Sequence, residues 1–430
     1  MLTAHAARIS QSHLTGSIAA PPSKSHTLRA ILFASLAKGS SKIKRYLVSP
    51  DTDAMIAACR QLGAIINLTP DTICITGVAG KPCTPADIID VGNSGIVLRF
   101  IMAVSALLPS HTLITGDHSV RTRRPVKPLM DALNSLGGAC YSLKGNDRAP
   151  LQIKGPIKSG HTCTFNGSDS QTVSGLMIAA SLLEGKTDLH ITHPGEIPWV
   201  GLTCHWLTQL GVNWVKHSDT HYTITGRSHW DGFDYTVPGD FSTIAFPLVA
   251  AVITQSSITI THLDFNDPQG DQKLINTLID MGANIIRNGT ELHVIPSDTL
   301  HGISIDVNDM IDAIPALSVV ACFAKGKTQL YNAAIAREKE CDRINAIKTE
   351  LSKCGATVSD APDSITIESG SLNASEFKSY HDHRTGMALS ALALALDQPS
   401  CIQNIACINK TYRHFYDDLI ALGANVELIA

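Results

Sequence analysis

The chain has 430 residues, of which 44% are apolar and 17% charged, with 34 basic and 38 acidic side chains. A chain of this length and composition is expected to fold into two or more domains of roughly 100–200 residues, which excludes an intrinsically disordered protein. The net charge of −4 provides no global basic field and argues against a nucleic-acid partner, so any anion site must be local.

Signals for membranes, export and disulfides are lacking in this sequence. The longest nearly unbroken apolar run, Met387–Leu396, has about half of the roughly 20 residues that span a bilayer. No basic segment followed by an apolar one opens the chain. The eleven cysteines are odd in number and never spaced C-x-x-C, which favours reduced thiols over disulfides or a structural zinc site. We therefore expect a cytoplasmic protein without a membrane partner.

One signature recurs six times: an amphipathic helical stretch ends in glycine and an alternating strand pattern follows. A glycine just past a helix can adopt the left-handed conformation that lets the chain turn into a strand. The steps between these glycines are 74, 74, 71, 73 and 68 residues, longer than the roughly 20–50 residues of common solenoid repeats. We therefore predict six compact α/β units. The glycines are Gly63, Gly137, Gly211, Gly282, Gly355 and Gly423.

Six units suggest two domains of three. A second strand-like run follows five of the six glycines. The proline-rich segments near residues 20 and 238 are the best boundaries, because proline restricts itself and the residue before it. This division predicts an inserted domain, 21–239, and a discontinuous domain, 1–20 plus 240–430, that the opening strand region completes. The five strand-like runs are Thr72–Thr76, Leu151–Lys154, Tyr222–Thr225, Glu291–Ile295 and Ser364–Glu368.

Polar or basic segments stand where loops enter helices, in both halves of the chain. Helix starts favour anions, and arginine forks match carboxylate and phosphate oxygens. Each segment alone is equally well explained by helix capping or solvated charges. Seven of them together predict an interdomain cleft for ligands with several negative charges. The segments are Pro22–Arg29, Gly92–Arg99, Arg121–Pro125, Ser168–Thr172, Arg337–Arg343, His381–Arg384 and Asn409–Tyr412.

These segments resemble, in order and spacing from about residue 20 to 415, the motifs of the 3-phosphoshikimate 1-carboxyvinyltransferase (5-enolpyruvylshikimate-3-phosphate synthase) family of enolpyruvyltransferases. The resemblance implies an α/β fold with two domains, each of three βαβαββ units, around an interdomain cleft. It implies transfer of the enolpyruvyl group from phosphoenolpyruvate to the 5-hydroxyl of shikimate 3-phosphate, with release of phosphate, through a tetrahedral ketal intermediate in the shikimate pathway. No metal or organic cofactor is expected, and we expect a monomer whose partners are these two anionic substrates.

The same resemblance implies roles for individual residues. Asp312 matches the base at the 5-hydroxyl and Glu340 the acid/base at the methylene carbon, with Lys24 as a third catalytic group. Lys24 and Lys339 are expected to keep both carboxylates ionised. The residues implied for shikimate 3-phosphate are Lys24, Ser25, Arg29, Ser170, Gln171, Asp312 and Lys339. Those implied for phosphoenolpyruvate are Lys24, Gly95, Arg124, Gln171, Arg343, Arg384 and Lys410.

The chain departs from the family pattern near the expected phosphate subsite. The residue before Ser170 is usually serine in the family, and here it is Asp169. A second family serine, a few residues before the position of Trp199, is replaced here by Glu196. Two acids would repel a phosphate unless a cation pairs with them, and Arg121 or Arg123 is the expected partner. Two apolar side chains, Ile96 and Ile335, replace polar ones.

Two other functions remain open from the sequence. The related UDP-N-acetylglucosamine enolpyruvyltransferases typically use a cysteine in a mobile loop and an asparagine after the first lysine. Here Ser25 follows Lys24, and residues 110–124 hold no cysteine. A catalytically silent homologue is the second alternative, which Asp169 and Glu196 suggest.

Overall fold

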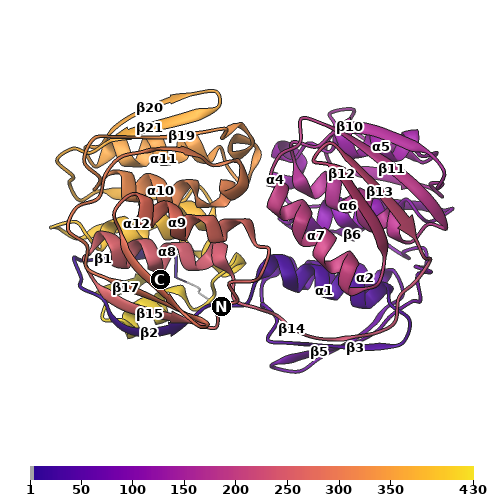
Figure 1. Cartoon of the computed structure of the whole chain (residues 1–430), viewed down its shortest axis with the longest axis horizontal. Helices are drawn as coiled ribbons and strands as arrows, with labels where there is room; N and C mark the ends of the chain where they lie inside the picture. Colours follow the sequence, from indigo (N-terminus) through magenta and orange to yellow (C-terminus); the bar gives the residue numbers. More distant parts are fainter. Residues whose placement is uncertain (1–3) are drawn as a thin grey trace. The chain divides into compact units, whose positions relative to one another are not determined.

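The computed structural model describes residues 4–430, and the chain separates into two compact units (Figure 1). Unit 1 consists of the chain up to Pro21 together with Pro238–Ala430, and unit 2 consists of Pro22–Val237. Each unit has its own core of buried apolar side chains. The chain therefore leaves unit 1 near its N-terminal end, builds the whole of unit 2 and then returns.

Unit 2 holds three four-stranded sheets of one pattern, in which a parallel pair of strands continues into two antiparallel pairings. The first sheet contains β14 (Asp234–Thr236), β3 (Ser40–Lys44), β5 (Thr72–Thr76) and β4 (Ile65–Leu68), with helices α1 (Lys24–Leu36) and α2 (Pro50–Gln61). The second contains β6 (Ile89–Asp90), β7 (His111–Thr115), β9 (Leu151–Lys154) and β8 (Ala139–Ser142), with α3 (Gly95–Ser105), α4 (His118–Arg123) and α5 (Lys127–Ser135). The third contains β10 (Thr162–Asn166), β11 (Gly185–Thr192), β13 (His221–Gly226) and β12 (Asn213–Ser218), with α6 (Ser170–Ser181) and α7 (Ile197–Gln209).

Unit 1 repeats this pattern three times. Its first sheet contains β2 (Thr15–Ala19), β15 (Ser257–Thr261), β17 (Glu291–Ile295) and β16 (Asn284–Asn288), with α8 (Phe241–Ile253), the short helix η1 (Gly270–Gln272) and α9 (Lys273–Asp280). The second contains β18 (Ser304–Asp306), β19 (Lys327–Tyr331), β21 (Ser364–Glu368) and β20 (Thr357–Ala361), with η2 (Asn308–Ala313), α10 (Ile314–Ala321), η3 (Ala334–Glu338) and α11 (Arg343–Lys353). The third contains β22 (Glu376–Lys378), β23 (Ser400–Gln403), β1 (Ala6–Ile9) and β24 (Val426–Ile429), with α12 (His383–Ala393), η4 (Ile405–Lys410) and α13 (Phe415–Ala421).

The predicted repeat is confirmed by these six sheets and by the backbone of its glycines. All six repeat glycines have φ between 68° and 104°, in the left-handed region that a residue with a side chain rarely adopts. The five predicted second strands are β5, β9, β13, β17 and β21. In the sixth sheet the corresponding position is taken by β1, which pairs antiparallel with both β23 and β24. The N-terminal segment therefore completes the last repeat.

The first helix of each repeat is buried almost all round, whereas the second has one exposed face. The buried helices are α1, α3 and α6 in unit 2 and α8, α10 and α12 in unit 1. Figure 1 shows α8, α10 and α12 in the middle of unit 1, with strands such as β20 and β2 at its edges. The apolar run Met387–Leu396 begins in α12, continues past its end at Ala393 and packs in the core of unit 1. Among the described residues, no helix has the length and apolar character needed to cross a membrane.

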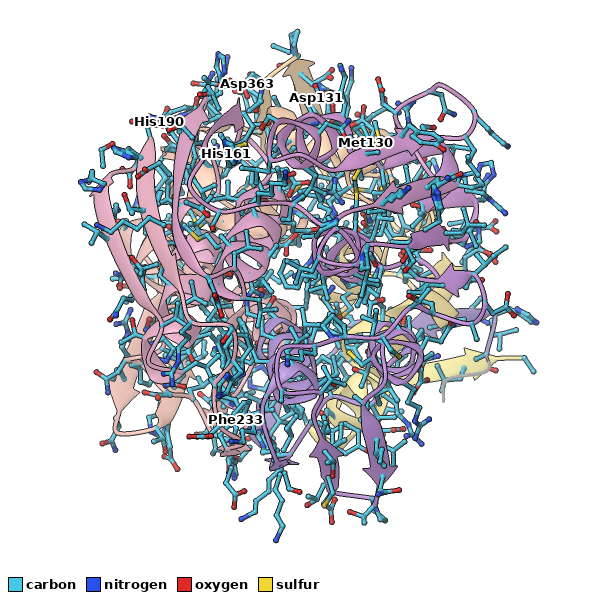
Figure 2. All side chains as sticks on the ribbon, turned by 90° about the vertical axis from the view of Figure 1, so that its right-hand side faces the viewer. Met130, Asp131, His161, His190, Phe233 and Asp363 are labelled. Carbon is cyan, nitrogen blue, oxygen red and sulfur yellow. The ribbon has the colours of Figure 1, made fainter. Side chains whose placement is uncertain are left out.

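The outer faces of the sheets carry polar side chains together with exposed apolar ones, such as Ile65 of β4 and Val215 of β12. In the third sheet of unit 2, His190 projects outward from β11 (Figure 2), and its ring stacks on that of His221 at 4.1 Å between centroids. All eleven cysteines are free in the structure.

Candidate active site

Several of the residues predicted for the site stand at helix starts. Lys24, Gly95 and Ser170 are the first residues of α1, α3 and α6, and Arg343 is the first residue of α11. The residue before each of these helices caps it, since its side-chain oxygen accepts a hydrogen bond from a backbone N–H in the first turn. The capping residues are Ser23, Ser94, Asp169 and Asp342.

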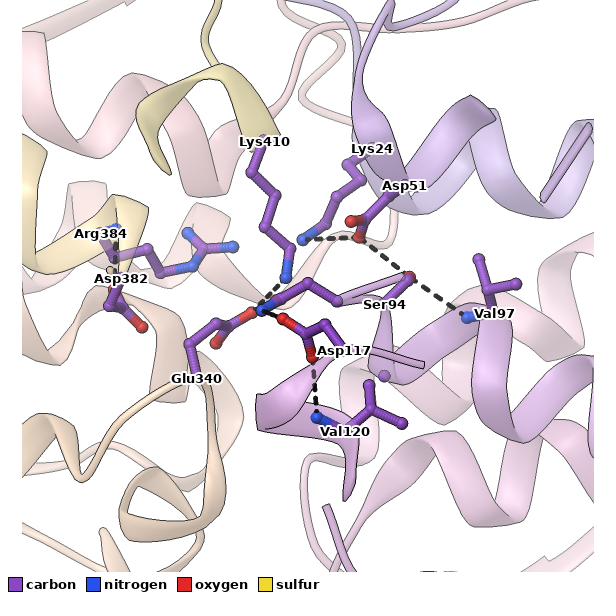
Figure 3. A network of polar contacts seen from close by, with 12 residues as sticks. Lys24, Asp51, Ser94, Val97, Asp117, Val120, Glu340, Asp382, Arg384 and Lys410 are labelled. Carbon is purple, nitrogen blue, oxygen red and sulfur yellow. Dashed lines mark hydrogen bonds and ion pairs between the residues drawn. The ribbon is translucent and has the colours of Figure 1, made fainter. Parts of the chain in front are cut away.

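In unit 1, three cations and two carboxylates form one continuous chain of ion pairs, here called the unit 1 ion network. Arg343 donates from NH1 to Asp312 at 2.6 Å and from NH2 to Glu340 at 2.8 Å. The far oxygen of Asp312 lies 2.7 Å from Arg384. The far oxygen of Glu340 accepts from Lys410 at 2.8 Å, a contact drawn in Figure 3. Each carboxylate therefore has two cationic partners.

The network is largely closed to solvent but open at one group. The side chains of Arg343, Arg384 and Glu340 are 1%, 4% and 8% exposed, whereas that of Asp312 is 26% exposed. Burial lowers the pKa of Arg343, but the surrounding carboxylates of Asp382, Glu340 and Asp312 outweigh burial and raise it well above its ordinary value. Arg343 is thus a fixed positive charge, and Asp312 is the carboxylate of the network most accessible to a ligand.

Asp382 holds this network in place, although the sequence did not assign it a role. One of its carboxylate oxygens accepts the N–H groups of Arg384 and Thr385 at 2.8 and 2.9 Å and so caps α12. The other oxygen accepts from Nε of Arg343 at 2.9 Å. One fully buried side chain therefore fixes the start of α12 and the guanidinium of Arg343 together.

A further buried acid, Asp271, lies behind the network. Ser242 donates to one of its oxygens, and the backbone carbonyl of Ser242 accepts from Arg384 at 3.3 Å. The other oxygen, Oδ1, has no hydrogen-bond partner among residues 4–430. Burial, and secondly the charge of Asp312, raise the pKa of Asp271 to about 7, against the smaller lowering effects of Arg384 and Ser242.

In unit 2, Lys24 belongs to a chain of polar contacts that links three helix starts. Its Nζ lies 3.8 Å from Asp51 Oδ2 at the start of α2, and the same oxygen accepts from Ser94 Oγ at 3.0 Å. Ser94 in turn caps α3 through the N–H of Val97 (Figure 3). Asp51 is buried and was not predicted from the sequence, although the Ser49-Pro50-Asp51 helix start is a visible signal.

Arg29 is buried among neutral oxygens. Its Nε and NH2 donate to Thr203 Oγ1 at 3.1 and 3.0 Å, NH1 donates to the carbonyl of Ser25 at 3.3 Å, and NH2 also donates to the carbonyl of Trp199 at 3.4 Å. Its guanidinium lies 5.1 Å from the ring centroid of Phe100. Burial lowers the pKa of Arg29 to about 9. Among residues 4–430 no carboxylate bonds to Arg29, so it is a buried cation without an anionic partner.

Gly95 stands at a close approach of three site side chains. A Cβ at this position would lie 3.1 Å from Gln171 Oε1 and 3.3 Å from NH1 of both Arg124 and Arg99. A side chain at this position would displace these three groups by a few tenths of an ångström, so glycine lets them approach the backbone closely. The structure thus brings together three of the predicted residues, Gly95, Arg124 and Gln171, and adds Arg99.

The structure shows how the two unusual acids of unit 2 are accommodated. Asp169 Oδ2 lies 2.6 Å from NH2 of Arg99, and Oδ1 accepts the N–H of Gln171 at 2.9 Å. Arg99, which lies one turn into α3, is therefore a cationic partner of Asp169 that the sequence did not predict, and the expected pairing with Arg121 or Arg123 stays a prediction. Glu196 Oε2 accepts from both the N–H and the hydroxyl of Ser170, at 3.1 and 2.9 Å.

The expectation that Lys24 and Lys339 keep the catalytic carboxylates ionised stays a prediction, and the ion pairs described for these carboxylates are with other cations of unit 1. There Asp312 and Glu340 are held by Arg343, Arg384 and Lys410. Lys339 is buried, directly before Glu340. Ile96 and Ile335 are partly buried and pack against the cores of units 2 and 1, respectively. Among residues 4–430, no group of three or more histidine, cysteine or acidic side chains has metal-binding geometry.

Comparisons with known proteins identify the family of the chain. The model of the family described as EPSP synthase (3-phosphoshikimate 1-carboxyvinyltransferase) matches residues 9–419. The 3-phosphoshikimate 1-carboxyvinyltransferase of Chlamydia caviae is 42% identical over 423 residues, which cover 98% of this chain and 94% of that protein. The enzyme of that name from Ruminiclostridium cellulolyticum is 38% identical over 422 residues, covering 98% and 99%.

A solved structure supports the same relationship. EPSP synthase from Acinetobacter baumannii superposes with a TM-score of 0.82 at 26% identity, covering 98% of this chain and 99% of that one. The shared fold is a two-domain α/β enolpyruvyltransferase fold, as the repeat predicts. The chain belongs to the EPSP synthase (3-phosphoshikimate 1-carboxyvinyltransferase) family.

Proposed function

We propose that the protein transfers the enolpyruvyl group of phosphoenolpyruvate to the 5-hydroxyl of shikimate 3-phosphate and releases phosphate. The observation that carries this proposal is the unit 1 ion network, in which two carboxylates are each held ionised by two cations. The reaction needs two such groups, because a hydroxyl loses a proton and a methylene carbon gains and then loses one. Membership of the family supplies the substrates.

Asp312 is the proposed base at the 5-hydroxyl. It is the more exposed of the two carboxylates, and its pairs with Arg343 and Arg384 favour its charged form. Glu340 is the proposed acid/base at the methylene carbon, and it can exchange protons there while Lys410 and Arg343 compensate its charge. Arg343, Arg384 and Lys410 are also the proposed cations for phosphoenolpyruvate, so substrate anions and these carboxylates compete for the same donors.

Unit 2 supplies the proposed binding groups for the acceptor. Arg29 is a cation buried among neutral oxygens, which suits a substrate carboxylate. Ser25, Ser170 and Gln171 add donors at helix starts, and Lys24 stands at the start of α1. Gly95, Arg124 and Gln171 form the proposed unit 2 contacts of phosphoenolpyruvate. Lys339 is proposed to contact the acceptor from the segment before Glu340. We propose that residues 21–239 form one domain and that residues 1–20 together with 240–430 form the other.

A steady-state assay of phosphate release tests the function. The purified protein is mixed with phosphoenolpyruvate and shikimate 3-phosphate, and in parallel with phosphoenolpyruvate and UDP-N-acetylglucosamine. We expect release with shikimate 3-phosphate only. Release with the nucleotide sugar alone would assign the related reaction, and no release with either acceptor would identify a silent homologue.

A further inference from the structure

The start of α6 is occupied by the protein's own anions. Its first N–H group, that of Ser170, donates to Glu196, and its second, that of Gln171, donates to Asp169. The third, that of Thr172, donates to the backbone carbonyl of Asp169 at 3.1 Å. The donors that make a helix start attractive to an anion are therefore already used by two carboxylates and a carbonyl.

Glu196 reaches this position at a conformational cost. Its φ of 49° and ψ of 42° lie in the left-handed region, which is sparsely populated for a residue with a side chain. It directly precedes α7, yet its side chain does not cap that helix. Its carboxylate instead turns to α6, and only 4% of the residue is exposed.

The neighbouring backbone fixes this arrangement. The N–H of Gly195 donates to the carbonyl of Gly167 at 3.1 Å, and a Cβ at Gly195 would lie 2.7 Å from the carbonyl oxygen of Ser168. The segment that carries Glu196 is thus held against the segment that leads into α6. A carboxylate held in this way is a defined feature of the site and not a mobile surface charge.

We propose that Glu196 is a specificity-determining residue for the phosphate of the acceptor, because it holds the two donors of Ser170 as an internal anion that a substrate phosphate must replace. This inference rests on the proposed function, in which Ser170 belongs to the site of shikimate 3-phosphate. A phosphate dianion and a carboxylate cannot share these donors without strong repulsion. The wild-type chain therefore binds the phosphorylated acceptor more weakly than its donors alone would allow.

The test replaces Glu196 by Gln, which keeps the length of the side chain and an acceptor oxygen but removes the charge. We expect the KM and the calorimetric Kd of shikimate 3-phosphate to fall by roughly tenfold, because like-charge repulsion in a desolvated site is lost. The KM of phosphoenolpyruvate should change by less than a factor of three. Glu184→Gln is the matched control, because Glu184 is an exposed acid just beyond the other end of α6.

The ratio of kcat/KM for shikimate 3-phosphate to that for unphosphorylated shikimate separates specificity from a structural effect. We expect this ratio to rise in the Gln variant, whereas a structural effect would change both acceptors alike. An unchanged or raised KM and Kd for shikimate 3-phosphate would overturn the inference. Glu196→Ser, which also removes the charge, serves if the Gln variant fails to fold.

The proposed function and this inference fail in different ways. If the wild-type chain does not turn over phosphoenolpyruvate and shikimate 3-phosphate, the proposed function fails, and calorimetric titration with shikimate 3-phosphate still decides the inference. Tighter binding by the Gln variant supports it. Equal or weaker binding by that variant contradicts it, whatever the activity.

Discussion

The two units share one repeat but place different chemistry at the ends of their helices. In unit 1, Asp312 and Glu340 are each clamped between two cations. In unit 2, the carboxylates Asp169 and Glu196 accept from helix-start donors, while Arg29 donates only to neutral oxygens among the described residues. A chain of ionised carboxylates suits proton transfer, whereas donors and a buried cation suit binding. The comparison predicts that substitutions in unit 1 change mainly kcat and those in unit 2 mainly KM.

The largest effect is expected for the carboxylates of the unit 1 ion network. Glu340→Gln and Asp312→Asn should each lower kcat by roughly 10²–10⁴-fold, because each removes a proposed proton-transfer group while keeping the size of the side chain. Calorimetric binding of shikimate 3-phosphate should change much less than kcat. Glu338→Gln is the control, because Glu338 is an exposed acid two residues from Glu340. A parent rate in either variant would remove that residue from the mechanism.

Arg343 should matter most for stability. Arg343→Met leaves Asp382, Asp312 and Glu340 without their shared partner, and breaking a buried ion pair costs about 3–5 kcal/mol of unfolding free energy. Arg337→Met provides the comparison, since Arg337 bridges Asp342 and Asp360 at a partly exposed position, where such pairs contribute about 0–1 kcal/mol. Urea unfolding measures both. Equal losses would show that the buried network has no special role in stability.

Arg29 should affect binding of the acceptor. Arg29→Lys should raise the KM of shikimate 3-phosphate by roughly 10–100-fold with a smaller change in kcat, because a hydrogen bond to a charged group contributes about 1.5–3 kcal/mol. Arg45→Lys is a matched control in the same unit, since Arg45 donates to the carbonyl of Val237 at 3.1 Å. If Arg29→Lys lowered kcat and left KM unchanged, the division of labour between the units would be wrong.

The smallest effect is a pH dependence of stability at Asp271. Its pKa is raised to about 7, chiefly by burial, so the native state keeps a proton between about pH 4 and 7 that the unfolded state has lost. Wild-type unfolding free energy should therefore fall, relative to Asp271→Asn, as the pH rises from 5 to 8. Urea unfolding at both pH values measures this difference, with Asp264→Asn, at an exposed position in the preceding loop, as the control. A rise would contradict the assignment.

Much of the fold could be predicted from the sequence, because the sequence patterns that indicate it are local. Each repeat is marked by a glycine at the end of a helix and by an alternating strand pattern after it, and both lie within about a dozen residues. This signal occurs six times, so the sequence predicts six units. The missing strand of the last repeat was harder to predict, because β1 lies about 400 residues away from β23 and β24 in the chain. The pairing of β1 with these two strands is seen only in the folded sheet.

Only part of the candidate site could be predicted from the sequence. Residues in family motifs, such as Lys24 and Arg343, were found, and the structure places them at helix starts. Asp51, Asp271 and Asp382 were not assigned, because their importance depends on contacts with residues 39 to 113 positions away in the chain. Arg99 was not recognised as the partner of Asp169 for the same reason, since 70 residues separate them.

The fate of the methylene protons tests the central claim most directly. Wild-type protein and Glu340→Gln are incubated in deuterium oxide with phosphoenolpyruvate and saturating shikimate 3-phosphate, and mass spectrometry follows deuterium at the methylene carbon of product and recovered phosphoenolpyruvate. Wild type should incorporate deuterium, Glu340→Gln should do so at least roughly 100-fold more slowly, and Arg29→Lys should retain exchange at saturating acceptor. Undiminished exchange in Glu340→Gln would contradict the account.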